Sequence, residues 1–148
     1  MLSFVDIEGN LAPEDCFLSR QIRSHPAADA DAFLTGFADR IRRSPTPSAA
    51  LYAAGLRHKV RPAAVPGIFS SMVDLTDRGD LLRTFLALPF PRLFLYGDRN
   101  ASLSYLPALR TGGVDVAEIP RSGHWPMSAN PVAMWDSITA FHRRHGQD

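Results

Sequence analysis

One histidine of this sequence stands in a setting suited to proton transfer. His124 follows a glycine in the segment Ser122-Gly123-His124-Trp125, which lies between a predicted strand and a predicted helix. A loop histidine of this kind can project its ring into a cleft, and an imidazole accepts and returns protons near neutral pH. The segment therefore predicts a general base at His124.

Two carboxylates follow predicted strands and are candidate partners for that ring. Glu8 comes directly after the first strand, and Asp98 follows Gly97 at the end of an apolar run. Ligands of open α/β sheets bind at the carboxyl ends of the strands. A carboxylate there can bond the second ring nitrogen of His124, fix its tautomer and stabilise the imidazolium. The alternatives are a solvated strand end for Glu8, a turn residue bonding its own backbone for Asp98, and no chemical role for His124.

Three strands are expected to position these residues. Residues 2–7 are rich in β-formers, residues 93–96 form a continuous apolar run, and residues 114–119 alternate. A run without alternation is typical of a strand covered on both faces, as in a parallel sheet. A helix is expected over 101–110 and a last one over 131–144, with Asn130 as its N-cap. This order predicts an α/β fold with a short parallel sheet of about three strands and flanking helices.

The last helix and the segment between the first two strands complete the expected architecture. Trp135, Ile138 and Phe141 are expected on the inner face of the last helix. Helices are expected over 12–25, 28–43, 47–60 and 76–86, with no strand among them. The predicted domains are therefore a core of residues 1–11 and 89–148 and an inserted helical segment of residues 12–88.

Composition excludes several classes of protein. The 148 residues are 45% hydrophobic and 21% charged, with a formal net charge of +1. These values argue against a disordered chain and against a nucleic-acid partner. No apolar stretch approaches the roughly 20 residues of a membrane span, and the start lacks the basic region of a signal peptide, so a cytoplasmic location is expected. The single cysteine, Cys16, excludes an internal disulfide and a cysteine-cluster metal site.

Three segments together resemble the C-terminal half of the α/β-hydrolase fold family. Residues 93–100, LFLYGDRN, resemble its seventh strand and the following turn. Residues 122–127, SGHWPM, resemble its catalytic-histidine loop, and residues 5–10, VDIEGN, resemble the end of its sixth strand. Residues 12–88 resemble the cap domain that the family inserts between strands six and seven.

The resemblance implies hydrolysis of an ester or similar bond in a small, largely apolar substrate, without metal or cofactor. His124 is then the general base. The family's usual acid position is occupied by Asn100, which has no charge to offer. Haloalkane dehalogenases and related enzymes place the acid after strand six in a similar Ile-Glu context, which favours Glu8 over Asp98.

Three further residues are predicted substrate contacts, and packing alone explains two of them equally well. Trp125 adjoins His124, Asn10 lies in the loop after the first strand, and Phe17 belongs to the cap-like segment. Ligand pockets are mostly apolar with a few polar groups, which suits this set.

The family's nucleophile motif, Gly-x-Ser-x-Gly, has no counterpart here, because no serine has glycines at both i−2 and i+2. Cys16 falls in a predicted helix and is interpreted as a packed residue. The expectation is a truncated product, a misplaced start or one half of a split protein, whose nucleophile (Ser or Asp) lies elsewhere. The alternative is an inactive fragment or pseudoenzyme that acts as a binding module. In either case the first strand would leave an open sheet edge, which predicts marginal stability and pairing with a partner or a second copy.

Overall fold

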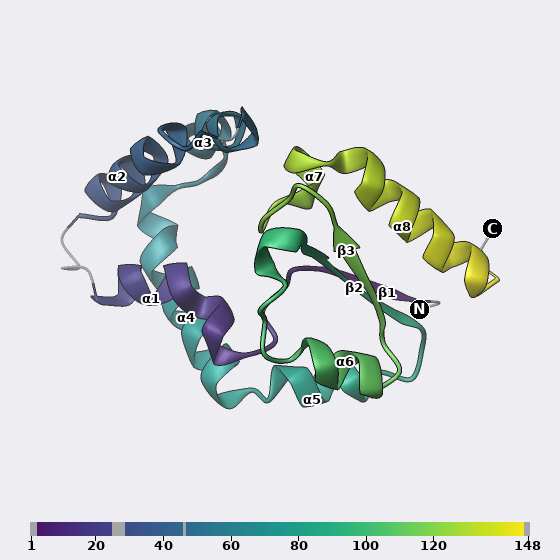
Figure 1. The fold of residues 1–148 in the computed structure, drawn as a ribbon. Helices are drawn as coiled ribbons and strands as arrows, with labels where there is room; N and C mark the ends of the chain where they lie inside the picture. Colours follow the sequence, from purple (N-terminus) through teal and green to yellow (C-terminus); the bar gives the residue numbers. More distant parts are fainter. Residues whose placement is uncertain (1–2, 25–28, 46, 147–148) are drawn as a thin grey trace. The chain divides into compact units, whose positions relative to one another are not determined.

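The computed structural model describes residues 3–24, 29–45 and 47–146 (Figure 1). The chain forms two compact units. The sheet unit comprises the residues up to Gly9 and those from Leu82 onward, and the helical unit is Asn10–Leu81. Residues 2, 25 and 28, where sequence patterns placed the ends of elements, lie outside the described residues.

The sheet unit contains one parallel sheet within the described residues. Strands β1 (Phe4–Ile7), β2 (Arg92–Gly97) and β3 (Asp115–Ile119) lie in the order β1-β2-β3. Val5 is in register with Leu93, and Leu95 with Ala117. The predicted α/β class with a three-stranded parallel sheet is therefore confirmed, with β2 in the centre, where its apolar residues belong.

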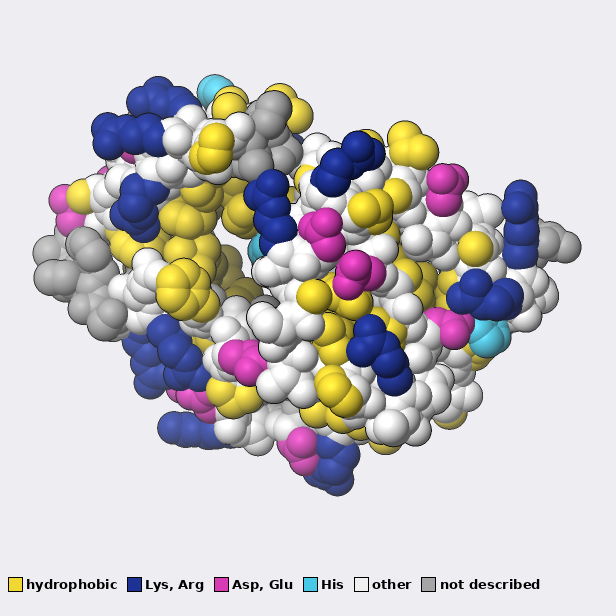
Figure 2. Space-filling view, viewed as in Figure 1, with side chains coloured by type: hydrophobic (Ala, Val, Ile, Leu, Met, Phe, Trp, Pro, Cys, Tyr) yellow, Lys and Arg dark blue, Asp and Glu magenta, His cyan; other side chains and the backbone are white. Residues whose placement is uncertain are grey.

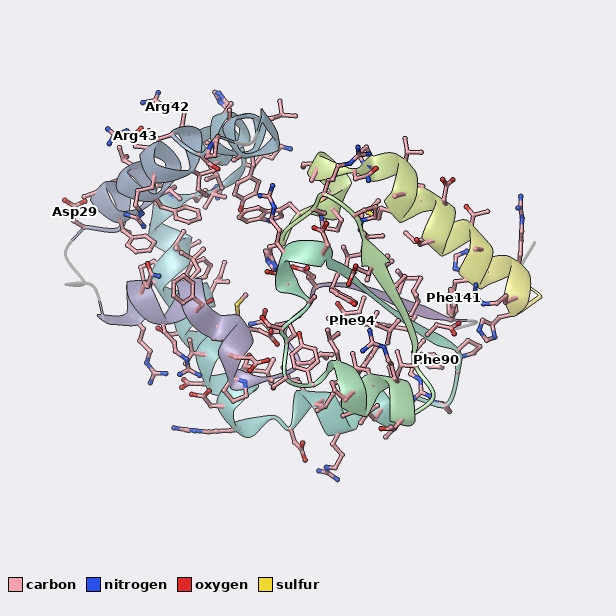
Figure 3. The ribbon with its side chains drawn as sticks, in the orientation of Figure 1. Asp29, Arg42, Arg43, Phe90, Phe94 and Phe141 are labelled. Atoms are coloured by element: carbon pink, nitrogen blue, oxygen red, sulfur yellow. The ribbon has the colours of Figure 1, made fainter. Side chains whose placement is uncertain are left out.

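Helices cover both faces of β2, which explains its unbroken apolar run. Alternate residues of a strand point to opposite faces. On one face the buried residues of β2 and β3 pack with α8 (Pro131–Arg144) in a cluster of Leu93, Leu95, Ile119, Met134, Ile138 and Phe141. On the other face Phe94 meets Tyr105 edge to face, with ring centroids 5.7 Å apart, just before α6 (Leu106–Thr111). Figure 3 labels Phe94 and Phe141, one on the central strand and one on α8.

The last helix begins as predicted, and Ile138 and Phe141 lie on its buried face as expected. The side chain of Asn130 accepts a hydrogen bond from the Ala133 amide, which confirms the N-cap. Trp135, however, is 60% exposed, so its prediction as a core residue is wrong. The buried stripe is Met134, Ile138 and Phe141, which follows the i, i+4, i+7 spacing of one helix face.

The boundary between the units lies earlier than residue 88. The short helix α5 (Leu81–Leu86) places Phe85 against Phe4 of β1, with ring centroids 5.8 Å apart. This contact of the buried Phe85 ties the residues after Leu81 to the sheet unit. The helix expected over 101–110 is also shorter than predicted, since α6 begins at Leu106 with a proline in its first turn.

The helical unit is built from six helical segments within the described residues: η1 (Pro13–Cys16), α1 (Phe17–Ser24), α2 (Ala30–Arg42), α3 (Pro47–Lys59), η2 (Pro62–Ala64) and α4 (Val65–Arg78). Buried Phe33 and Val65 form a small core with the partly buried Leu18, Phe37, Val60 and Phe69. Asp29, labelled in Figure 3, caps α2 by accepting from the Ala32 amide at 2.7 Å.

Helix α4 was not predicted at its true position. No helix is predicted between residues 60 and 76, but Pro66 and Gly67 lie in the first turn of α4, where a proline needs no amide partner. The helix expected over 76–86 is interrupted at Gly79 and Asp80, and Asp80 has a φ of 48°.

Charges of both signs are distributed over the surface. Figure 2 shows Lys and Arg side chains interspersed with Asp and Glu on the visible face of the sheet unit. Among the helices of the described ranges, none combines the length and apolar character that crossing a bilayer requires.

Candidate active site

The structure brings Glu8 and His124 together at the carboxyl ends of the strands. Glu8 directly follows β1, and its amide still bonds the Leu95 carbonyl of β2 at 2.9 Å. His124 lies in the loop between β3 and the short helix α7 (Pro126–Ala129). Its Nδ1 is 2.8 Å from Oε2 of Glu8. Two residues far apart in the sequence thus form one hydrogen-bonded pair within the sheet unit.

The carboxylate of Glu8 is buried and held by three donors. Its Oε1 accepts from the Gly97 amide at 2.6 Å. Its Oε2 accepts from Nδ2 of Asn100 at 2.8 Å as well as from His124. Glu8 is 5% exposed, and a carboxylate removed from water needs such partners. The hydrogen bonds therefore fix both oxygens relative to β2.

The backbone of Glu8 is itself unusual. Its φ is 48°, in the left-handed region that a residue other than glycine rarely adopts. Such a conformation costs on the order of 1–3 kcal/mol and persists when surrounding contacts enforce it. The three hydrogen bonds on the side chain supply that enforcement.

The contact with Glu8 sets the tautomer of His124. A carboxylate oxygen accepts, so Nδ1 carries the hydrogen and Nε2 keeps its lone pair. The side chain is 53% exposed, and Nε2 has no hydrogen bond from the described residues. One ring nitrogen is thus fixed by Glu8 in a side chain that is half exposed, which is an arrangement that general bases use.

Trp125, a predicted substrate contact, lies beside this ring. The two ring centroids are 5.2 Å apart with an interplanar angle of 72°. This edge-to-face contact restricts the imidazole from a second side. A role for Trp125 in binding a substrate stays a prediction.

Asp98, the alternative partner for His124, has other contacts. Its carboxylate accepts from the amides of Arg121 at 2.7 Å and Ser122 at 3.0 Å. These two hydrogen bonds hold the pKa of Asp98 below its ordinary value. Asp98 therefore does not bond the imidazole: its carboxylate binds chiefly the backbone of the histidine loop, with a smaller contribution from the Arg99 amide of its own turn.

Gly97 and Asn100 were not predicted as parts of the site. A Cβ on Gly97 would lie 2.5 Å from the carbonyl oxygens of Ser122 and Gly123, so only glycine lets the loop approach β2 this closely. The sequence did single out Asn100, but as a missing acid. Its actual contact is with Glu8, which follows the preceding strand, and this contact depends on the parallel pairing of β1 with β2.

Asn10 and Phe17 belong to the helical unit. Asn10 donates to Sγ of the buried Cys16 at 3.2 Å, and Phe17 is 76% exposed at the start of α1. Their roles as substrate contacts stay predictions. In the part of the chain that is described, no three His, Cys, Asp or Glu side chains gather as metal ligands would.

No protein-family model matches this chain, and no curated protein matches it either. Its function is therefore inferred from the contacts of its own residues.

Proposed function

We propose that the sheet unit carries the general-base half of a hydrolase active site of the α/β-hydrolase type. The observation that carries the proposal is the 2.8 Å contact between Nδ1 of His124 and Oε2 of Glu8, with the imidazole side chain 53% exposed. The proposed substrate is an ester or similar bond in a small, largely apolar molecule. In this proposal the helical unit corresponds to the family's cap, and the sheet unit to strands six to eight.

The chemistry follows from the two ring nitrogens. Nε2 of His124 accepts the proton of a hydroxyl group as its oxygen attacks the scissile carbonyl carbon. The ring then carries a positive charge, which the Glu8 carboxylate stabilises through Nδ1. When the tetrahedral intermediate collapses, Nε2 returns the proton to the leaving oxygen. Such proton transfer contributes typically about 10²–10⁴-fold to a rate.

The attacking hydroxyl has two possible sources in this proposal. A covalent route with a serine nucleophile takes the hydroxyl from another segment, because the chain has no Gly-x-Ser-x-Gly elbow. With an aspartate nucleophile, whose carboxylate has no proton to give up, His124 would instead activate the water that hydrolyses the covalent ester. A direct route uses water, which can reach the half-exposed imidazole without another protein group. Both routes depend on the same Glu8–His124 pair.

An association module is the second candidate, and one observation favours it. β1 is an edge strand of the sheet as the described residues form it, and its Phe4 is 36% exposed. Edge strands offer unpaired backbone groups to another chain.

Hydrolysis of p-nitrophenyl acetate by the purified chain separates the two candidates. We expect release of p-nitrophenol above the buffer rate, lost in His124→Ala and retained in His58→Ala, whose exposed histidine lies in the helical unit. Equal rates for the wild type and His124→Ala would contradict the hydrolase proposal. Concentration-dependent sedimentation would then test the association module.

A further inference from the structure

Asp98 links the turn after β2 to the loop that carries His124. Its Oδ2 accepts from the Arg121 amide at 2.7 Å, and its Oδ1 accepts from the Ser122 amide at 3.0 Å. Two successive amides that converge on one carboxylate form an anion-binding nest. Because both oxygens are used, the contact fixes the direction of the loop as well as its distance from β2.

Other contacts hold the same two segments together. The Arg99 amide donates to the Ser122 carbonyl at 3.1 Å, so the turn both donates to and accepts from this residue. Ser122 is 1% exposed. The residues immediately before Gly123 and His124 are thus fixed to the turn after β2.

The loop also contains a strained residue. Arg121 has a φ of 57°, which costs on the order of 1–2 kcal/mol for a residue with a Cβ. This conformation directs the amides of residues 121 and 122 to one point. Asp98 is the acceptor at that point, so its carboxylate offsets the strain.

We infer that Asp98 is a positioning residue for His124: its carboxylate fixes the backbone from which the imidazole is projected onto Glu8. The catalytic consequence rests on the proposed function, whereas the effect on the ring does not. The lowered pKa of Asp98, caused by the Arg121 and Ser122 amides, agrees with a carboxylate that is ionised whenever the loop is in place.

The first experiment compares Asp98→Ala with Asp136→Ala, which removes an exposed carboxylate of α8. Nitrogen-15 NMR of the imidazoles reports the tautomer and the Nδ1 proton, with the His124 signals assigned by their loss in His124→Ala. We expect the Nδ1 proton signal of His124 to be lost or broadened in Asp98→Ala and unchanged in Asp136→Ala. Ester hydrolysis should fall roughly tenfold in kcat with a smaller change in KM, as expected when a group is misplaced.

Two milder variants guard against misfolding of Asp98→Ala. Asp98→Asn keeps one acceptor oxygen and should give an intermediate loss of the His124 signal. Arg121→Gly keeps both amide donors while removing the left-handed strain, and should leave the signal intact.

An unchanged His124 signal in folded Asp98→Ala, or in Asp98→Asn if the alanine variant does not fold, would overturn the inference. Failure of the proposed function has a different signature. In that case His124→Ala would hydrolyse the ester as fast as the wild type, while the NMR comparison of Asp98 variants would still report on positioning.

Discussion

Asn100 and His124 donate to the same oxygen of Glu8. Nδ2 of Asn100 and Nδ1 of His124 each lie 2.8 Å from Oε2. Two donors on one acceptor constrain the carboxylate more than either would alone. Asn100 follows the central strand β2, and His124 follows its neighbour β3. A change in the charge or in the hydrogen-bonding capacity of residue 100 should therefore alter the contact between Glu8 and the imidazole.

Two replacements of Asn100 should lower the stability of the protein, and their effects should differ in pH dependence. Asn100→Ala removes one donor from a buried carboxylate and should cost about 1–3 kcal/mol in the free energy of unfolding. Asn100→Asp instead places a second carboxylate against Glu8, and two adjacent carboxylates hold a proton between them rather than both ionising. Urea unfolding should show Asn100→Asp to be the less stable variant at pH 8 and to recover relative to Asn100→Ala at pH 5. A pH-independent difference between the two would contradict this assignment.

Gly97→Ala should displace the histidine loop. The added Cβ would meet two carbonyl oxygens at 2.5 Å, and backbone on both sides leaves little room for adjustment. Overpacking of this kind typically costs about 1–3 kcal/mol. Gly123→Ala is the matched control, because its Cβ would lie 3.9 Å from the nearest atom, in the Arg99 side chain. Tryptophan fluorescence is a suitable probe, since Trp125 and Trp135 both lie in the sheet unit, and equal destabilisation by the two variants would refute the packing argument.

Asp115 should make the sheet unit sensitive to acid. Burial raises the pKa of Asp115, but hydrogen bonds from His145 and Arg144 outweigh it, so the pKa is lowered from 3.8. A carboxyl whose folded pKa is lowered stabilises the protein above its unfolded pKa and loses that contribution as pH falls through the folded value. Because the side chains of Arg144 and Asp115 are 55% and 35% exposed, the contribution should stay below about 1 kcal/mol.

Unfolding midpoints between pH 2 and pH 7 test this assignment. Asp115→Asn should be less stable than the wild type at pH 7, and the two should converge near pH 2. Asp136→Asn serves as the control, and the same convergence in that variant would show that Asp115 is not the cause.

The face of α8 that packs on the sheet predicts opposite outcomes for two aromatic residues. Phe141→Ala removes a fully buried ring and should cost about 3–5 kcal/mol. Trp135→Ala removes a side chain that is 60% exposed and should change stability by less than about 0.5 kcal/mol. Thermal unfolding followed by circular dichroism measures both, and a large loss from Trp135→Ala would show that this face of α8 is covered.

The sequence predicts strand β2 and helix α8 because each depends on local pattern, and it places Glu8, Asp98 and His124 at one sheet edge. The choice of Glu8 over Asp98 comes only from the resemblance to haloalkane dehalogenases. An apolar run identifies β2, and Asn130-Pro131 marks the start of α8. The rule that carboxyl ends of parallel strands share one edge then brings the two polar turns together.

The features that the sequence does not predict are of two kinds. Some depend on contacts between backbone segments far apart in the sequence, and others on which of two adjacent helix residues faces the core. The amides that bind Asp98 are oriented by the φ of Arg121, which no pattern reveals. Trp135 and Met134 are adjacent, and a one-residue shift in the helix stripe decides which is buried. Pro66 is compatible with a helix start and with a helix end, so the first part of α4 was not predicted.

The pairing of Phe4 with Arg92 has a consequence for the order of folding. Strands β2 and β3 and helix α8 are near one another in sequence and can assemble early, whereas β1 can join only after the ends of the intervening helical unit have met. Closure of so long a loop is entropically unfavourable and slows the step that depends on it. The Glu8–His124 hydrogen bond therefore forms only after β1 has paired with β2. Its appearance during refolding would report when the sheet is complete.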